Sequence, residues 1–275
     1  MLVGKLGLRK PVDMYAPWLA YSYRTLRDLT SWRSFRQTPY GFGLAGNSEM
    51  ATADFEPSEV NAFLRHCGTC DVVLDIGANV GFYSCLAANQ GKHVVSFEPA
   101  PRNLKFLYRN LWSNGFSAVE VLPVALGPKP GLMPIYGFGG ISSLVPGWAQ
   151  APDRPAGLVP VTTLDLVAAN RFPGEQLFIK MDVEGFELDV LAGADETLNR
   201  SPKPTWMLEI MLASSFIPGG TSRKFAETFD VFWSHGYQCK ILGQHEQHVS
   251  PETVKGWVRS GRVETGAHNF LFLGE

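Results

Sequence analysis

Two acidic residues and two glycines lie at the ends of the first two apolar runs that follow residue 70. An apolar run ends in a segment that contains Asp75, Gly77, Asn79 and Gly81, and Glu98 stands 21 residues beyond Gly77. Glycine permits a tight turn and a close approach of backbone to a ligand. In doubly wound sheets, an acid after the second strand accepts hydrogen bonds from the hydroxyls of a ribose. These residues therefore predict a site for an adenosine compound.

The same turn indicates which adenosine compound fits. The middle position of a dinucleotide-binding turn is glycine so that backbone can meet a pyrophosphate, but here it is Asn79. Asp75 would repel a diphosphate and attract an ammonium or sulfonium cation. S-Adenosylmethionine carries both cations and no phosphate, so we predict it as the cofactor. The alternative is a plain strand-to-helix turn in which Asp75 caps the helix.

A second polar group follows a later apolar run at 177–181. Lys180, Asp182 and Glu184 fall at the carboxyl end of this predicted strand, where open α/β sheets bind ligands. Asp182 is the first candidate for a general base or for an anchor of the acceptor, and Glu184 is the second. The alternative is a structural ion pair that anchors the strand. Three histidines near the last strand are further candidates for the base: His245, His248 and His268.

Metal chemistry is the weaker alternative for these acids. Asp182 and Glu209 end neighbouring predicted strands and could share a divalent ion, but two carboxylates make only half of a site. Cys67 and Cys70 have no second Cys or His pair at zinc-site spacing, so we expect two buried thiols. No metal ligand is therefore predicted.

Alternating strand-length and helix-length patterns must position these groups. From Asp71 onward they predict an α/β fold with a parallel sheet and helices on both of its faces. Seven strands are expected, at 72–76, 93–97, 119–124, 177–181, 205–210, 238–242 and 269–273.

Residues 126–160 interrupt this pattern. They are rich in Gly and Pro and predict a long excursion over the surface, of the kind that forms lids and binding loops. Ser142 and Ser143 are candidates for contacts to the carboxylate of the cofactor or to the acceptor, although a role in a turn is also open. For Trp148, core packing and a platform for the acceptor are both open.

The N-terminal region differs in kind, so we divide the chain into a cap segment at 1–54 and a catalytic domain at 55–275. Leu19, Tyr23, Leu26 and Leu29 fall on one face of a possible helix. We expect this stripe to pack on the domain, and an amphipathic helix on a membrane surface is the alternative.

Composition excludes several classes of protein. With 275 residues, 45% hydrophobic and 18% charged, the chain is expected to be globular rather than disordered or fibrous. With a net charge of −2, the chain has no excess of positive charge that would bind a polyanion, so nucleic acid is not expected as a partner. Four cysteines form no disulfide framework, and we find no signal segment or membrane-spanning run, so a cytoplasmic location is expected.

Several motifs together resemble the FkbM family of S-adenosylmethionine-dependent methyltransferases. The similarity runs from about Phe55 to Leu212, and its motifs lie in order at 72–83, 97–101, 125–127, 142–144, 163–165 and 179–187. The resemblance implies a Rossmann-like class I methyltransferase fold. It also implies O-methylation of a hydroxyl on a sugar, glycan, polyketide or other natural product.

The resemblance also implies which residues act. The region around Lys180, Asp182 and Glu184 would border the reacting centre. The cofactor would be held by Asp75, Gly77, Ala78, Asn79, Gly81, Phe82, Tyr83, Glu98, Pro99, Asn103, Ala125, Ser143 and Asp182. N-Methylation and a catalytically silent, cofactor-binding scaffold are the alternatives. The acceptor, the methylated position, a metal requirement and the oligomeric state do not follow from the sequence.

Overall fold

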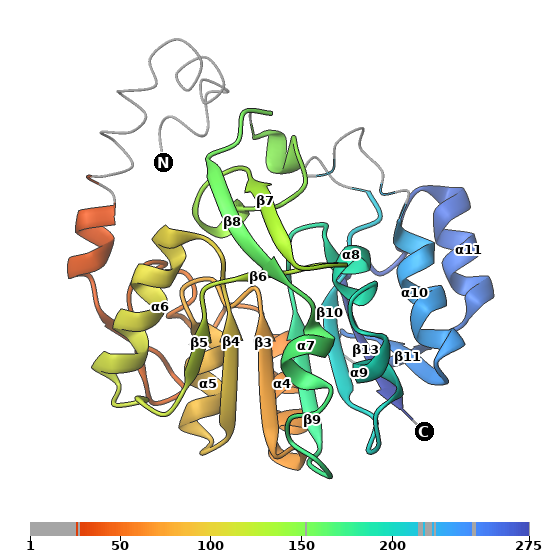
Figure 1. Cartoon of the computed structure of the whole chain (residues 1–275), viewed down its shortest axis with the longest axis horizontal. Helices are drawn as coiled ribbons and strands as arrows, with labels where there is room; N and C mark the ends of the chain where they lie inside the picture. The colour runs from red at the N-terminus through yellow and green to blue at the C-terminus, as the bar shows by residue number, and fades with distance from the viewer. Residues whose placement is uncertain are drawn as a thin grey trace.

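A large mixed sheet with helices on both faces forms the body of the molecule (Figure 1). The computed structural model describes residues 26, 28–151, 153–213, 217, 222, 224–243 and 246–274. Its main sheet has eight strands: β3 Val72–Ile76, β4 His93–Phe97, β5 Glu120–Leu122, β9 Leu177–Met181, β10 Thr205–Glu209, β11 Tyr237–Ile241, β12 Gln247–Val249 and β13 Asn269–Gly274.

The strand order creates a crevice at the centre of the sheet. The order is β12-β11-β13-β10-β9-β3-β4-β5, and the five strands from β10 to β5 run parallel, while β13 is antiparallel to both of its neighbours. The chain leaves β3 toward β4 on one side and later returns as β9 on the other. Ligands bind outside the carboxyl ends of the strands at such a switch point. The predicted fold class is confirmed.

Among the described residues, the main sheet has one strand more than the seven that the sequence predicts. The addition is β12, which pairs antiparallel with β11 at the edge of the sheet. Gln247 and His248 in this strand are exposed. A three-residue strand with two polar, exposed residues lacks the apolar run by which the other seven are found.

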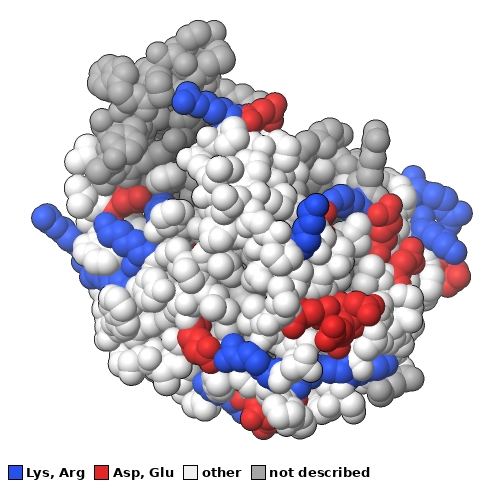
Figure 2. Space-filling model, viewed as in Figure 1, with Lys and Arg blue, Asp and Glu red and all other residues white. Residues whose placement is uncertain are grey.

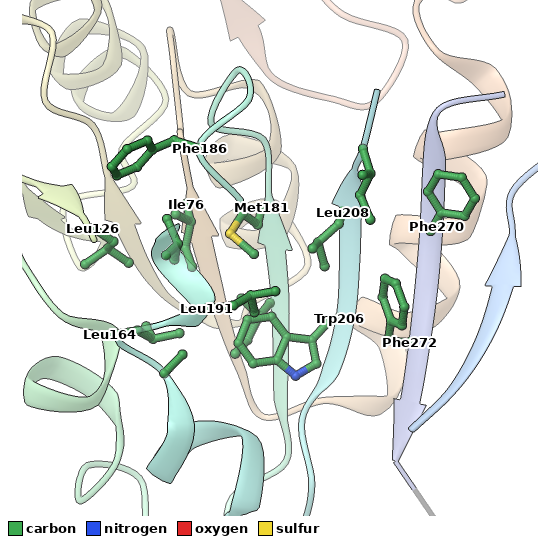
Figure 3. Close-up of a cluster of buried hydrophobic side chains, with 14 of the residues drawn as sticks. Ile76, Leu126, Leu164, Met181, Phe186, Leu191, Trp206, Leu208, Phe270 and Phe272 are labelled. Carbon is green, nitrogen blue, oxygen red and sulfur yellow. The ribbon is translucent and has the colours of Figure 1, made fainter. Parts of the chain in front are cut away.

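Buried strands divide their side chains between two hydrophobic cores. Val72, Leu74 and Ile76 of β3 enter one core, and Val73 enters the other, as the period of two in a strand requires. Figure 3 shows part of the first core, in which Ile76, Met181 and Leu208 come from neighbouring strands. Because both faces are covered, these strands read as continuous apolar runs.

Helices supply the other half of each core. The first core takes apolar residues from α7 Leu164–Ala168, α8 Glu187–Leu191, α9 Asp195–Asn199, α10 Phe225–Ser234 and α11 Pro251–Ser260. The second core takes them from α4 Pro57–Thr69, α5 Phe82–Asn89 and α6 Pro101–Ser113. The four cysteines are free and buried.

The segment predicted as a long surface excursion is a small sheet. Strands β6 Ala125–Leu126, β8 Gly157–Thr162 and β7 Gly131–Ile135 pair in that order, and the short helices η1 Gly139–Ile141 and η2 Trp148–Gln150 lie between β7 and β8. This sheet lies beyond the carboxyl ends of the central strands (Figure 1). The sequence did not predict these strands, because Pro134 and Pro160 lie inside them, where proline is rare.

The described part of the N-terminal segment packs against α6. Trp32 contacts Phe106, with ring centroids 5.6 Å apart, and the guanidinium of Arg109 lies 4.4 Å from the Trp32 ring centroid. The strands β1 Arg36–Gln37 and β2 Gly43–Leu44 follow. Of the predicted apolar stripe, Leu26 and Leu29 are exposed, contrary to the expected packing, and Leu19 and Tyr23 lie outside the described residues.

Charged side chains are mixed over the surface. Figure 2 shows Lys and Arg interspersed with Asp and Glu on one face. Within the described ranges, no helix has the length and apolar character needed to cross a membrane.

Candidate active site

The turn between β3 and α5 forms the floor of a groove at the switch point. Gly77 and Ala78 donate backbone hydrogen bonds to the Phe97 carbonyl, at 2.9 and 3.0 Å, which ties the turn to the end of β4. Gly77 has φ +83°, and a Cβ there would lie 1.9 Å from the Asp182 carbonyl oxygen. Only glycine therefore lets the turn and the loop after β9 approach so closely.

Glu98 closes one end of this groove. Its carboxylate accepts hydrogen bonds from the backbone N–H of Asn79, at 2.8 Å, and of Ala100, at 2.7 Å. The side chain is buried, and burial raises the pKa of Glu98 to about 7. The Asn103 side chain is a third hydrogen-bond partner of this carboxyl. A carboxylate has about four lone-pair sites, so the rigidly held Glu98 can still accept from a ligand.

A cavity of about 600 Å³, counted out to its mouth, extends from Glu98 along the ends of β3 and β4. The predicted cofactor residues on its wall are Gly77, Asn79, Glu98, Pro99, Asn103, Ala125, Ser143 and Asp182. None of the described residues that line it is Lys or Arg, whereas Glu98, Asp182 and Glu184 are acidic. This wall suits a cationic adenosine compound and does not suit a diphosphate. The residues present therefore fit S-adenosylmethionine.

Two of these residues hold the small-sheet segment over the cavity. Asn103 from α6 donates a side-chain hydrogen bond to the Gly139 carbonyl at 3.2 Å. The Ser143 hydroxyl donates to the Glu184 carbonyl at 2.7 Å and accepts from the Val145 N–H. Because the single O–H donor of the Ser143 side chain is used, this hydroxyl cannot also donate to a carboxylate of the cofactor.

Five predicted cofactor residues do not line the cavity: Asp75, Ala78, Gly81, Phe82 and Tyr83. Asp75 is buried beneath the turn, where its carboxyl accepts a hydrogen bond from the Ser84 hydroxyl. Burial raises the pKa of Asp75. The arrangement gives no support to the expected contact between Asp75 and a cofactor cation.

The other four shape the turn and its surroundings. Gly81 has φ +89° and packs so closely that a Cβ would lie 2.5 Å from Leu107 Cδ1. Phe82 joins an aromatic cluster, and the Tyr83 hydroxyl donates to Glu56 at 2.6 Å. Ala78 is buried among apolar side chains.

The buried Lys180 forms an ion pair with the partly exposed Asp182 at the end of β9. Lys180 Nζ lies 3.3 Å from Asp182 Oδ2 and 4.6 Å from the Tyr83 ring centroid. Burial alone would lower the pKa of Lys180, but the carboxylates of Asp182 and Asp75 overcome it and raise this pKa. Lys180 therefore stays charged and fixes the position of Asp182.

A second cavity, of about 1,460 Å³ counted in the same way, lies on the other side of Asp182. Asp182 and Glu184 line both cavities. The second cavity carries two more carboxyl groups, those of Glu187 and Glu209, and the one lysine among its described lining residues, Lys224, is paired with Asp189.

Crowding and burial make these acids hard to ionise. Burial and then the charge of Asp182 raise the pKa of Glu184 to about 8, and burial raises the pKa of Glu187 to about 7. The charge of Asp182, followed by burial, raises the pKa of Glu209 to about 9. Perturbed carboxyl groups in a cavity are typical of catalytic sites.

Sequence reasoning left an acceptor platform open for Trp148 and placed Glu187 in the segment that borders the reacting centre, but it did not predict the hydrogen bonds of either residue. Trp148 Nε1 donates to Glu184, and Glu187 accepts from the Gly185 N–H at 3.0 Å. No sequence pattern marks these contacts, because they depend on how the small sheet meets the loop after β9.

The histidines and the metal alternative can also be placed. His248 lies in β12, His268 immediately precedes β13, and His245 lies outside the described residues. Neither His248 nor His268 lines the two cavities. Among the described residues, no group of three or more His, Cys, Asp or Glu is arranged to hold a metal ion.

Comparisons with known proteins show which family the chain resembles. The methyltransferase FkbM domain matches residues 75–239. Methyltransferase sdnD of Sordaria araneosa is 33% identical over 157 residues, which are 45% of this chain and 60% of that protein. The chain thus matches less than two thirds of the length of this relative.

Solved structures of methyltransferases are also similar. The methyltransferase FkbM from Methylobacillus flagellatus KT has a TM-score of 0.45 and 19% identity, over 74% of this chain and 43% of that one. The Aeropyrum pernix fibrillarin complex with S-adenosyl-L-methionine has a TM-score of 0.40 and 12% identity, over 74% and 65% of the two chains. The domain match spans more than half of the sequence, so this chain belongs to the methyltransferase FkbM family, whose methyl donor is S-adenosylmethionine.

Proposed function

We propose that this protein is an S-adenosylmethionine-dependent O-methyltransferase that acts on a hydroxyl of a sugar or another hydroxyl-rich natural product. One observation carries the proposal: the cavity that fits the cofactor and the larger acidic cavity meet at Asp182 and Glu184. A methyl group that passes between two bound molecules must cross such a junction. Alignment of the two partners there can lower the barrier by up to about 7 to 11 kcal/mol.

At the cofactor end, Glu98 accepts hydrogen bonds from the two ribose hydroxyls. Its carboxylate is already fixed by two backbone N–H groups, so little freedom is lost on binding. Leu126, Ile135 and Phe186 give the same cavity an apolar wall for the adenine ring.

At the junction, Glu184 takes the proton of the acceptor hydroxyl. S-Adenosylmethionine supplies the methyl group in electrophilic form. A general base works best when its pKa lies near the operating pH, and Glu184 at about 8 meets this condition. Asp182, held by Lys180, anchors the acceptor with a hydrogen bond.

The walls of the second cavity favour a hydroxyl-rich acceptor. Four carboxyl groups line it, and those that are ionised would repel a carboxylate or phosphate on the acceptor. Hydroxyls can donate to carboxylates and accept from protonated carboxyl groups, so a polyol satisfies both states.

A transfer assay with cofactor labelled in its methyl group tests the proposal. The purified protein is incubated with a panel of sugars, glycosides and polyketide alcohols, with amines as a separate arm. Label in a methyl ether is the expected result, with turnover reduced about 10² to 10⁴-fold in Glu184→Gln. Glu227→Gln, an exposed acid on α10, is the control. Transfer to nitrogen alone, or cofactor binding with no transfer to any acceptor, would refute the proposal.

A further inference from the structure

Glu184 lies in a backbone conformation that its own residue type does not favour. Its φ is +56°, and that of the following Gly185 is +91°. Left-handed conformations are disfavoured for residues with a Cβ and persist where surrounding contacts enforce them. The contacts that hold Glu184 here come from the small-sheet segment.

Trp148 provides the closest of these contacts. Its indole Nε1 donates to Glu184 Oε2, and its ring lies so near the loop that a Cβ on Gly185 would meet Trp148 Cζ3 at 2.4 Å. The Ser143 hydroxyl holds the Glu184 carbonyl from the same segment. Side chain and backbone of Glu184 are therefore both fixed from across the site.

Trp148 is buried but is not part of either hydrophobic core. Only 3% of its surface is exposed, yet neither of the two clusters of buried apolar residues includes it. The backbone around it is also strained, with φ of +51° at Ala149 and +57° at Gln150. A tryptophan held in this way away from a core points to a role in the site rather than in general packing.

We propose that Trp148 is a positioning residue for methyl transfer, which holds the Glu184 carboxylate at the junction of the two cavities by occupying Oε2 and leaving Oε1 for the acceptor hydroxyl. The inference rests on the proposed function, because Glu184 acts there as the base. It adds a residue that contacts neither reacting atom and lies on the acceptor side of the junction.

The indole bond also influences when Glu184 ionises. A donor to a carboxylate stabilises the charged form, so Trp148 lowers the pKa of Glu184 against the raising effects of burial and of Asp182. The other charged groups that face Glu184 are Lys180, Glu187 and Glu209. Trp148→Phe leaves those groups in place and removes the donor, together with part of the ring that packs on Gly185. The pKa of Glu184 should therefore rise further.

The test begins with the indole N–H signals of ¹⁵N-labelled protein. The chain has seven tryptophans, and the signal missing from Trp148→Phe identifies Trp148. We expect its chemical shift to titrate with a midpoint near 8, the pKa of Glu184, and this titration to disappear in Glu184→Gln. The inference would be overturned, without any assay of transfer, if the chemical shift of the Trp148 indole N–H did not change with pH. It would also be overturned if this shift titrated in the same way in Glu184→Gln.

Kinetics then separate positioning from mere structure. In Trp148→Phe, the acidic limb of the pH profile of kcat/KM, which reports the ionisation of the base, should move about one pH unit upward. The Kd of S-adenosylhomocysteine should stay within about twofold of its value in the unmodified protein. Trp112→Phe, an exposed tryptophan on α6, should leave both unchanged. A lower rate with an unmoved pH limb would assign Trp148 a structural role only. Failure of the proposed function would be seen separately, as absent cofactor binding or transfer in the unmodified protein.

Discussion

Replacement of Glu98 by glutamine should weaken binding of the cofactor and remove its dependence on pH. The carboxylate accepts from the backbone N–H groups of Asn79 and Ala100, and its pKa is about 7 because of burial. The amide introduced by Glu98→Gln has one oxygen for two backbone donors, and its NH₂ group could not accept from ribose. Loss of a charge-assisted pair of hydrogen bonds costs about 2 kcal/mol, or roughly 30-fold in Kd.

The sign of the pH effect follows from the raised pKa. Ribose hydroxyls bind best to the ionised carboxylate, which makes up about 10% of Glu98 at pH 6 and about 90% at pH 8. Affinity should therefore rise about tenfold across this range. Adenosine is the best ligand for calorimetry. It lacks the chain of S-adenosylmethionine that carries the amine and the sulfonium, and it does not titrate between pH 6 and pH 8.

Controls make this prediction decisive. Glu252→Gln, an exposed acid on α11, should bind adenosine and S-adenosylhomocysteine as the unmodified protein does. If Glu98→Gln also retained full affinity, or kept the pH dependence, the ribose would not be held by Glu98 and the reasoning about the groove would be refuted.

Three further changes probe the junction and its acids. Asp182→Asn should lower kcat roughly 10- to 100-fold through loss of the acceptor anchor and spare the Kd of S-adenosylhomocysteine; unchanged kcat would remove Asp182 from the mechanism. The melting temperature of the cofactor-free protein should fall between about pH 5 and pH 9, because the folded state retains carboxyl protons that the unfolded chain releases near pH 4.5. Glu209→Gln should make this fall smaller. A melting temperature that rises with pH would contradict the raised pKa values. Gly77→Ala should destabilise the fold by about 2 to 3 kcal/mol in urea unfolding, since its Cβ would overlap the Asp182 carbonyl; a neutral substitution would show that the loop after β9 can move away.

The main sheet could be predicted because its strands are buried on both faces. Runs such as Val72–Ile76 and Leu177–Met181 are nearly all apolar, and burial of every position in both strands confirms the reason. The small sheet was not predicted, because its strands β7 and β8 contain prolines and show no regular alternation of exposed and buried positions along their length. Short strands with weak periodicity look like loops in a sequence.

Sequence position predicted the edge of the sheet at which the site lies but not which way each side chain points. Glu98, Asn79 and Asp182 reach the groove as expected, whereas Asp75 turns toward α5 and bonds to Ser84. The contact of Trp148 in η2 with Glu184 in the loop after β9 joins residues 36 positions apart in the sequence, so only the folded chain brings it about.

A crystal structure of the protein with S-adenosylhomocysteine tests the central claim most directly. The account predicts both ribose hydroxyls within hydrogen-bond distance of the Glu98 carboxylate, and the sulfur directed toward the junction at Asp182 and Glu184. A ligand bound elsewhere, or one whose sulfur points away from the acidic cavity, would contradict it.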